Sequence, residues 1–152
     1  MRVILTTVKS ASVSINDKVV GHLGHLGYLL LVGFTHGDDQ EIVDKMVHKI
    51  LSLRVFPDEK NLINLSLQDV NGDILSVSQF TLYASVSGGR RPSFIEAMRP
   101  NEAEILYDYF NQQLENQYRP INTGVFGADM VVTSENLGPF TLILDSKELF
   151  KI

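Results

Sequence analysis

Hydrophobic and polar residues alternate along the first part of the chain in the way that is typical of β-strands. "RVILTTV" and "ASVSI" both have this character, and the polar "NDK" (residues 16–18) separates the second from "VVGHL". Short polar turns of this kind join the two strands of a hairpin. We therefore expect two strands at the start of the chain and a hairpin between the second of them and "VVGHL".

A nearly unbroken apolar segment follows. "GYLLLVGF", Gly27 to Phe34, has glycines near both ends, which is typical of a strand covered on both faces. From Asp39 to Leu53 the apolar residues recur every three or four positions, which predicts an amphipathic helix. Its apolar stripe consists of Ile42, Val43, Met46, Val47, Ile50 and Leu53.

The second half of the chain predicts a further strand, a second helix and a final pair of strands. "FPDEKN" is expected to be a loop and "DILSVSQFTLYA" a strand. Residues 101–117 predict a helix that Asn101 and Glu104 begin as a capping box. "TGVFGADMVVTSENLGPFTLILD" predicts two strands joined by a turn at residues 135–138.

The predicted strand over residues 74–84 changes character along one of its faces. Alternation places on this face Leu75, Val77, Gln79, Thr81 and Tyr83. The face is apolar at first and polar at Gln79 and Thr81. This change is typical of a strand that runs into a pocket, although two polar residues facing water near a sheet edge give the same pattern.

Composition limits the range of functions. At 152 residues the chain is expected to form one domain, residues 1–152, and it contains no cysteine, which excludes disulfides and thiol catalysis. No apolar stretch reaches the roughly 18 residues of a membrane span and no signal-peptide pattern opens the chain, so we expect a cytoplasmic protein. The net charge of −5 argues against a protein that coats nucleic acid, but it leaves room for a local basic patch.

Common catalytic motifs are absent from the sequence. It has no nucleophile elbow, no P-loop and no dinucleotide fingerprint. His22 and His25 stand three residues apart without an acidic partner, so we expect neither a metal site nor another cofactor. If the protein is an enzyme, this pattern favours catalysis by position and dipoles rather than by a strong base. From charge alone, Arg90 and Arg91 in "SGGRRPS" are expected in a solvated loop.

Four segments occur in an order and at separations that resemble the D-aminoacyl-tRNA deacylase family, formerly called D-tyrosyl-tRNA deacylases. They are "SVSQFTLYA", "GRRPSF", "TGVFGADM" and "NLGPFT", and the similarity extends from "MRVIL" to "LILD". The resemblance implies a homodimer of mixed α/β fold, with helices packed on β layers in a three-layer domain. It also implies hydrolysis of the ester between a D-amino acid and the terminal adenosine of tRNA, at a site in the dimer interface.

The same resemblance implies which residues form this site. The pocket would be lined by the S-Q-F-T motif, which is Ser78, Gln79, Phe80 and Thr81. Gly138 and Pro139 would enter it from the partner subunit, joined by a cis peptide bond, with Asn136 beside them. Backbone carbonyls aimed around the α-carbon of the substrate would exclude an L side chain and admit a D side chain. Glycine has no side chain to exclude, so glycyl-tRNA, including glycine mischarged on tRNA-Ala, is a further expected substrate.

The chemistry that follows needs no strong base. Backbone N–H groups at Phe80 and Thr81 would hold the ester carbonyl as an oxyanion site. No side-chain base is visible to activate Thr81 as a nucleophile. We therefore favour attack by water, assisted by the 2′-hydroxyl of the substrate, with Gln79 and Thr81 as positioning groups. Under this resemblance Arg90 and Arg91 become candidates for contact with tRNA phosphates.

The chain also departs from the family pattern. Relatives usually carry Gln-Arg where Thr6 and Thr7 stand, and that arginine is expected to brace the Gly-Pro loop. Leu137 and Phe140 replace an acid and a valine, and "NLIN" replaces G-K-M-N. Two alternatives therefore stay open. One is a diverged dimeric relative that binds aminoacyl-adenosine or tRNA ends without efficient turnover, and the other is a hydrolase of other D-aminoacyl esters or N-acyl compounds.

Overall fold

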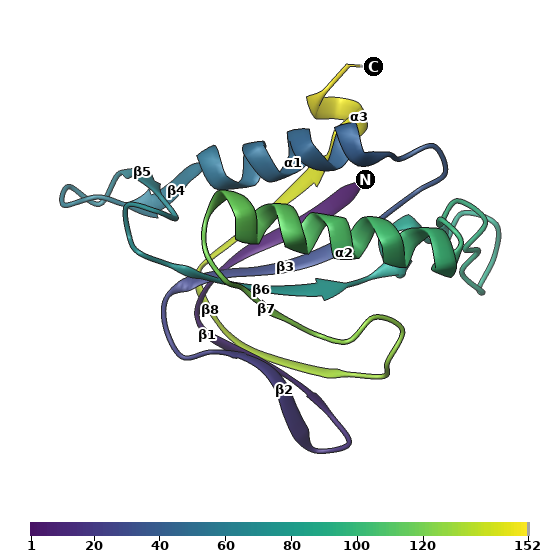
Figure 1. Cartoon of the computed structure of the whole chain (residues 1–152), viewed down its shortest axis with the longest axis horizontal. Helices are drawn as coiled ribbons and strands as arrows, with labels where there is room; N and C mark the ends of the chain where they lie inside the picture. The colour runs from purple at the N-terminus through teal and green to yellow at the C-terminus, as the bar shows by residue number, and fades with distance from the viewer. Residues whose placement is uncertain (152) are drawn as a thin grey trace.

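The computed structural model describes residues 1–151 of the chain. Helices α1 and α2 lie side by side on one face of a six-stranded mixed sheet, and the β4–β5 hairpin projects at one end (Figure 1). The elements are β1 (Arg2–Ile15), β2 (Lys18–Leu23), β3 (Gly27–Gly33), α1 (Gln40–Ser52), β4 (Arg54–Pro57), β5 (Ile63–Ser66), β6 (Asp73–Ser78), a 3₁₀ turn (Phe80–Tyr83), α2 (Pro100–Gln117), β7 (Asn122–Thr123), β8 (Val131–Asp145) and α3 (Ser146–Leu149).

Strand β1 organises the sheet. The strand order is β2-β1-β3-β6-β7. β8 lies outside this order and also pairs with β1. β1 runs antiparallel to β2, β3 and β8, whereas β3 and β6 are parallel. β2 also contacts β6 and β7, so the sheet curls toward a barrel. The predicted mixed α/β class is confirmed.

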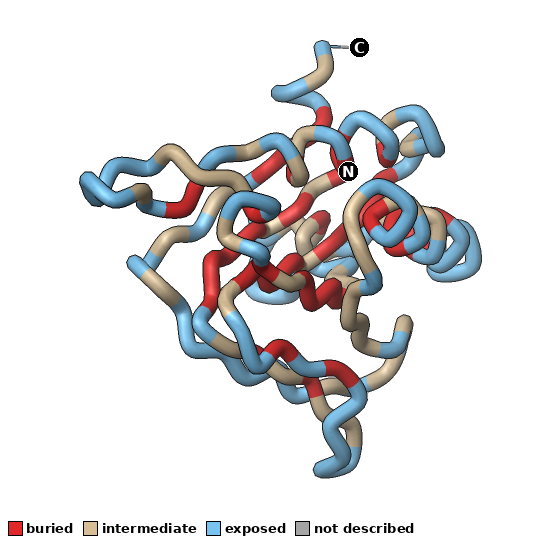
Figure 2. Tube along the Cα trace, turned by 60° about the vertical axis from the view of Figure 1, so that its left-hand side comes forward, coloured by how far each residue is buried: buried red, intermediate tan, exposed pale blue. Residues whose placement is uncertain are grey.

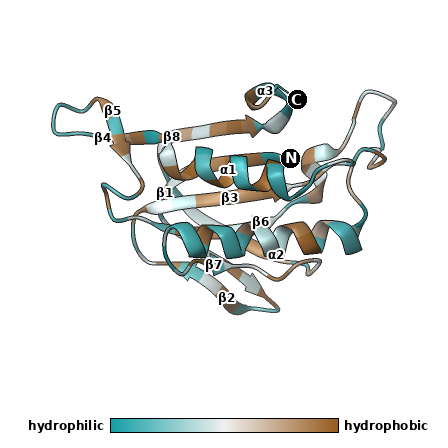
Figure 3. Ribbon diagram, turned by 45° about the horizontal axis from the view of Figure 1, so that its top comes forward, coloured by the Kyte–Doolittle hydropathy of each residue, from teal (hydrophilic) through white to brown (hydrophobic). Residues whose placement is uncertain are grey.

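The core has two parts, one on each face of the sheet. The larger part lies between the sheet and the two long helices, where buried segments gather in Figure 2. Its fully buried side chains include Tyr28, Leu30, Met46, Ile50, Phe110 and Leu114. The smaller part lies inside the curl of the sheet and includes Val8, Val13, Leu23, Leu29 and Leu75. Since neighbouring residues of β3 enter different parts, this strand is covered on both faces, as its apolar sequence predicts (Figure 3).

Two local predictions are confirmed by backbone geometry. Asn16 and Asp17 have positive φ angles of 49° and 65°, as the tight turn between β1 and β2 requires. Helix α1 begins after Asp39, whose carboxylate accepts a hydrogen bond from the backbone N–H of Ile42 at 3.0 Å. No helix in residues 1–151 is long and apolar enough to cross a membrane.

Several predicted boundaries are wrong. "RVILTTV" and "ASVSI" form one strand, β1, and "FPDEKN" is only partly a loop, because Phe56 and Pro57 belong to β4. The capping box is also wrong, since α2 begins one residue earlier, after Arg99, and has no side-chain cap. Pro100 occupies the start of the helix, where its missing N–H has no cost.

The two predicted strands of greatest interest also differ from the structure. The strand expected over residues 74–84 ends at Ser78, and residues 80–83 form a 3₁₀ turn, so the alternation of faces does not continue beyond this point. The expected turn at residues 135–138 is absent. β8 instead runs along β1 from Val131 to Asp145 and bulges out at the Gly-Pro pair.

Candidate active site

A cavity of about 660 Å³ opens where the parallel strands β3 and β6 end. Ligands commonly bind at the carboxyl ends of parallel strands. The end of β3, the turn after β6, the start of α2 and the loop over residues 126–130 all contribute to its wall. The lining is mostly apolar, with Ser78 and Gln79 as hydrogen-bonding groups.

The S-Q-F-T residues meet at this cavity. Ser78, Gln79 and Phe80 line it. Of the two polar residues expected to run into a pocket, Gln79 lines this cavity, whereas Thr81 is not among its lining residues. Thr81 is exposed next to them, and its Oγ1 accepts a 2.6 Å hydrogen bond from Nε2 of Gln79. The backbone N–H of Gln79 donates to the carbonyl of Val32 at 2.7 Å and so holds the turn against β3.

Gly33 allows this close approach of the turn. A Cβ atom on Gly33 would lie 2.8 Å from the carbonyl oxygen of Gln79, a distance that would force the backbone to shift. Gly33 also lines the cavity. The sequence shows Gly33 among apolar residues, but it does not show that Gln79 packs against it.

Aromatic and apolar residues form much of the cavity, and of these sequence reasoning assigned a role in the site to Phe80 alone. Phe80 and Phe94 pack edge to face with ring centroids 5.1 Å apart, and both remain partly exposed. Phe126 and Met130 contribute from the loop before β8. Phe94, Phe126 and Met130 all lie in segments that carry the family resemblance, and this was the one feature of the sequence that could have marked them as site residues.

Among the lining residues that the structure describes, Asp129 is the only carboxylate that could act as a base. Within residues 1–151, its charged lining residues are Arg99 and Asp129, and none is a histidine. Nε2 of His36 lies 2.7 Å from the carbonyl oxygen of Ile95, and the Thr35 hydroxyl donates to the carbonyl of Glu96 at 2.6 Å. These contacts hold the segment before α2 at the rim rather than supply a proton acceptor to the interior.

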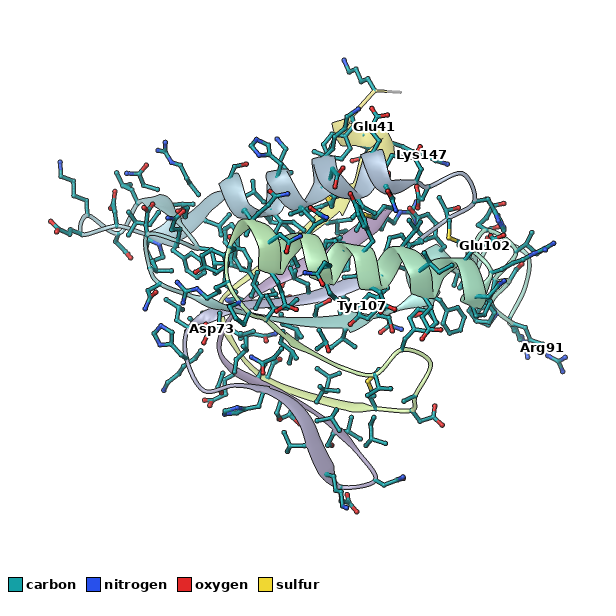
Figure 4. The ribbon with its side chains drawn as sticks, viewed as in Figure 1. Glu41, Asp73, Arg91, Glu102, Tyr107 and Lys147 are labelled. Carbon is teal, nitrogen blue, oxygen red and sulfur yellow. The ribbon has the colours of Figure 1, made fainter. Side chains whose placement is uncertain are left out.

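A buried tyrosine supports β6 from the side of α2. The hydroxyl of Tyr107 donates to the carbonyl of Ser76 at 2.8 Å, and burial raises the pKa of Tyr107 (Figure 4). The phenol is therefore a structural donor near neutral pH. The described part of the chain, residues 1–151, contains no group of three or more His, Cys, Asp or Glu side chains that could hold a metal ion.

Gly138 and Pro139 lie on a bulge of β8. Thr6 pairs with Thr141 and Val8 pairs with Asn136, so that Thr7 alone faces the four residues 137–140. Gly138 and Pro139 are exposed there, and the peptide bond between them is cis, as the resemblance implied.

Only glycine suits the first position of this pair. Gly138 has a φ of +107°, and a Cβ on it would lie 2.7 Å from the backbone nitrogen of Phe140. The nearby Asn136 is also exposed, and its Oδ1 accepts a 2.7 Å hydrogen bond from the Ser134 hydroxyl. Neither Asn136, Gly138 nor Pro139 lines the cavity of its own chain. One chain therefore does not bring the Gly-Pro pair together with the S-Q-F-T residues.

Arg90 and Arg91 lie in the loop between the 3₁₀ turn and α2. Both are exposed, next to Gly89 with its φ of +133°. Arg91 extends away from the body of the molecule (Figure 4). Among residues 1–151 neither guanidinium has an acidic partner within ion-pair distance.

Comparison with known proteins decides the family. The family model described as D-Tyr-tRNA(Tyr) deacylase matches residues 4–145. The chain belongs to the D-aminoacyl-tRNA deacylase family. A relative from Lactobacillus acidophilus named "D-aminoacyl-tRNA deacylase" is 53% identical over 145 residues, which cover 95% of this chain and 99% of the relative. A relative of the same name from Listeria monocytogenes is 52% identical over 149 residues, which cover 98% of each chain.

Solved structures share the deacylase fold. The structure called "c-Myc DNA Unwinding Element Binding Protein" superposes with a TM-score of 0.90 at 40% identity, over 95% of this chain and 98% of that chain. A structure described as a probable eukaryotic D-amino acid tRNA deacylase superposes with a TM-score of 0.80 at 22% identity, over 94% and 97%. Family membership makes the chain an enzyme, a hydrolase that acts on aminoacyl-tRNA.

Proposed function

We propose that the chain releases D-amino acids, and glycine, from tRNA as a homodimer in which each site combines parts of both subunits. The observation that carries this proposal is the separation of the two motifs. The S-Q-F-T residues border a cavity, whereas Gly138 and Pro139 stand exposed on a bulge outside it. A second copy that placed its bulge over the cavity would complete the site.

The free edge of β8 supports a second copy as partner. Within residues 1–151, β8 pairs only with β1, so one edge of a 15-residue strand has no neighbour. Val131 and Ile143 on this strand are 66% and 71% exposed. Exposed edges that carry apolar side chains are sites of association between chains. A partner packed along this edge would cover these side chains.

The cavity suits the end of an aminoacylated tRNA. Its volume falls in the usual range for small-molecule sites, and its apolar walls at Phe126 and Met130 fit a nucleobase. The first N–H groups of a 3₁₀ turn have no partner within the turn, so those of Phe80 and Thr81 are suited to hold the ester oxygen as it gains charge.

Water is the proposed nucleophile. The Gln79 amide donates to the Thr81 hydroxyl, and an N–H donor does not accept the proton that a threonine nucleophile must lose. In the proposed step, water adds to the ester carbonyl carbon and the bond to the ribose 3′-oxygen breaks. The 2′-hydroxyl of the substrate passes the proton, and the products are the free amino acid and tRNA. Ser78, Gln79 and Thr81 act by position.

Selection of the D-enantiomer is assigned to the partner's bulge. Backbone carbonyls around Gly138 and Pro139 would lie beside the α-carbon of the substrate, where an L side chain would collide with them. A D side chain would point outward and glycine would leave the space empty, so both would be accepted. Asn136 is proposed to support this edge of the site. Arg90 and Arg91 would contact phosphates of the tRNA, a substrate that is found in the cytoplasm.

The test is hydrolysis of D-Tyr-tRNA, L-Tyr-tRNA and Gly-tRNA by the purified protein and by a Pro139→Ala variant. We expect the unchanged protein to release D-tyrosine and glycine and to spare L-Tyr-tRNA. In Pro139→Ala the ratio of D to L hydrolysis should fall by on the order of 10- to 100-fold, because steric selection against one group is worth about 1–3 kcal/mol.

Pro120→Ala, at an exposed proline in the loop after α2, is the matched control and should behave like the unchanged protein. If D-Tyr-tRNA stays charged while a correctly dimeric protein still binds aminoacyl-adenosine, the binding alternative replaces this proposal. Equal hydrolysis of D-tyrosyl esters that lack tRNA and the vicinal hydroxyl would favour the broader esterase.

A further inference from the structure

The bulge that carries Gly138 and Pro139 is held from β1. The β1–β8 ladder changes register twice, between Thr6 and Val8 and between Val8 and Ser10, and the larger break is the one where Thr7 faces residues 137–140. The Thr7 side chain is buried there, with 3% of its surface exposed, and its hydroxyl donates to the carbonyl oxygen of Leu137 at 3.2 Å. Within residues 1–151, this is the only side-chain hydrogen bond to the backbone of residues 137–140.

The far side of the bulge is held by different contacts. The hydroxyls of Thr6 and Thr141 lie 3.3 Å apart at the pair where the ladder resumes. The ring of Phe140 packs against the larger part of the core. Neither contact reaches the peptide group that joins Leu137 to Gly138, so the orientation of that peptide depends on Thr7.

This orientation matters for the groups next to Gly138. A planar trans peptide directs its C=O and its N–H to opposite sides. When the Thr7 hydroxyl holds the Leu137 carbonyl toward β1, the N–H of Gly138 must point away from β1, on the exposed side of the bulge. Because Gly138 follows this peptide directly, the fixed plane also limits the directions in which the carbonyl groups of Gly138 and Pro139 can project.

We propose that Thr7 is a positioning residue for chiral selection, which acts by holding the Leu137–Gly138 peptide with its hydroxyl. The inference rests on the proposed function, in which this bulge excludes L side chains. Loss of the hydroxyl leaves the Leu137 carbonyl without its partner and frees the peptide to turn toward water. Exclusion by collision requires a fixed wall, so a mobile bulge admits L-aminoacyl substrates that a fixed one rejects.

The experiment compares Thr7→Val with Thr7→Ser and Thr6→Val in the intact dimer. Valine keeps the size of threonine and removes the hydroxyl, serine keeps the hydroxyl, and Thr6→Val removes an equally buried hydroxyl that does not touch the backbone of the bulge. For each variant, kcat and KM are measured with D-Tyr-tRNA and L-Tyr-tRNA. Backbone motion is followed by NMR relaxation, as the order parameters of the Gly138 and Phe140 amides.

We expect Thr7→Val to lower the D-to-L ratio of kcat/KM by about 10-fold and to lower the backbone order parameters at the bulge. The kcat for D-Tyr-tRNA should change by less than about 3-fold. Thr7→Ser should restore both readouts, and Thr6→Val should leave the ratio within about 2-fold of the unchanged protein. A role confined to folding stability would lower the amount of active enzyme without changing the ratio.

Separate outcomes identify which proposal fails. If Pro139→Ala destroys selection while Thr7→Val keeps both the D-to-L ratio and the order parameters of the unchanged protein, the role of Thr7 is refuted and the filter stands. If Pro139→Ala leaves selection intact, the filter itself is wrong, and the role proposed for Thr7 in selection is overturned with it. Thr7→Ala serves as the second variant if Thr7→Val does not fold, because it removes the hydroxyl without adding a methyl group against Leu137.

Discussion

At the scale of single residues, hydrogen-bond direction separates the possible roles of Thr81. Its hydroxyl receives the amide of Gln79 at 2.6 Å, and no lining residue of the cavity in residues 1–151 is a histidine that could take its proton. In the proposed mechanism this threonine orders the site and does not attack the ester. Gly33 acts in a similar indirect way, because the absence of its side chain lets the turn approach β3.

Thr81→Val is therefore expected to slow hydrolysis of D-Tyr-tRNA without abolishing it. Loss of one positioning hydrogen bond, worth about 1 kcal/mol, corresponds to roughly a 5- to 10-fold decrease in kcat. By contrast, a substrate with a 2′-deoxy terminal adenosine should react at least about 100-fold more slowly with the unchanged enzyme, since it lacks the proton-transfer group. The measurement is single-turnover deacylation. Complete inactivity of Thr81→Val would restore the covalent mechanism.

At the scale of elements, connecting segments carry most of the functional groups while the strands hold them in place. The turn after β6 presents the S-Q-F-T residues, the bulge of β8 presents Gly138 and Pro139, and the loop before α2 presents Arg90 and Arg91. Each of these segments is tied at its ends to a buried strand or helix. The loop before α2, for example, is held at Thr35 and His36.

The arginine loop is expected to contribute affinity for tRNA but not chemistry. Replacing Arg90 and Arg91 by alanine together should raise KM for D-Tyr-tRNA about 5- to 10-fold and reduce the salt dependence of binding, by roughly 0.7 to 0.9 in logarithmic slope per lost phosphate contact. Hydrolysis of D-tyrosyl-adenosine should be unaffected. Lys18→Ala with Lys60→Ala, at the exposed start of β2 and in the exposed turn between β4 and β5, is the charge-matched control. Equal losses on both substrates would show that the loop shapes the cavity instead.

At the scale of the whole molecule, the two ends of the chain are tied to one another, while the Gly-Pro bulge stands apart from the cavity. Arg2 pairs with Asp145 at 2.7 Å, and although partial burial opposes ionisation, this pair and the backbone N–H of Lys147 hold the pKa of Asp145 below its usual value. A site shared between two copies is the arrangement that we propose for the bulge and the cavity.

Complementation between two variants, one that lacks a proposed oxyanion donor and one that lacks selectivity, tests this shared site. Phe80→Pro removes a proposed oxyanion donor from one half, at a turn position that tolerates proline, and Pro139→Ala alters the other half. Unfolding the two proteins together and refolding them as a mixture should give heterodimers that each contain one intact site, so that selective hydrolysis recovers to about a quarter of the unchanged value. Refolding each variant alone is the control. No recovery in mixtures that contain heterodimers would place the whole site within one chain.

The sequence by itself determined those parts of this protein that depend on near neighbours. The three-to-four spacing from residue 39 to 53 predicted α1, because residues one turn apart share a face of the helix. The apolar run of β3 predicted a strand covered on both sides, and the composition around Asn16 predicted the first hairpin. The four quoted segments were sufficient to identify the family.

Only the tertiary structure decided the features that depend on contacts across the sheet. The hydrogen bond from Thr7 to Leu137 joins residues that are 130 positions apart, at a break in the β1–β8 ladder. The periodic pattern of hydrophobic residues within one segment does not predict a contact between two distant segments. The sequence did not show that β6 ends at Ser78, because strand-like residues continue through the 3₁₀ turn that follows. Strand register and the cavity arise from packing between distant segments, whereas helix and strand patterns arise from the geometry of consecutive residues.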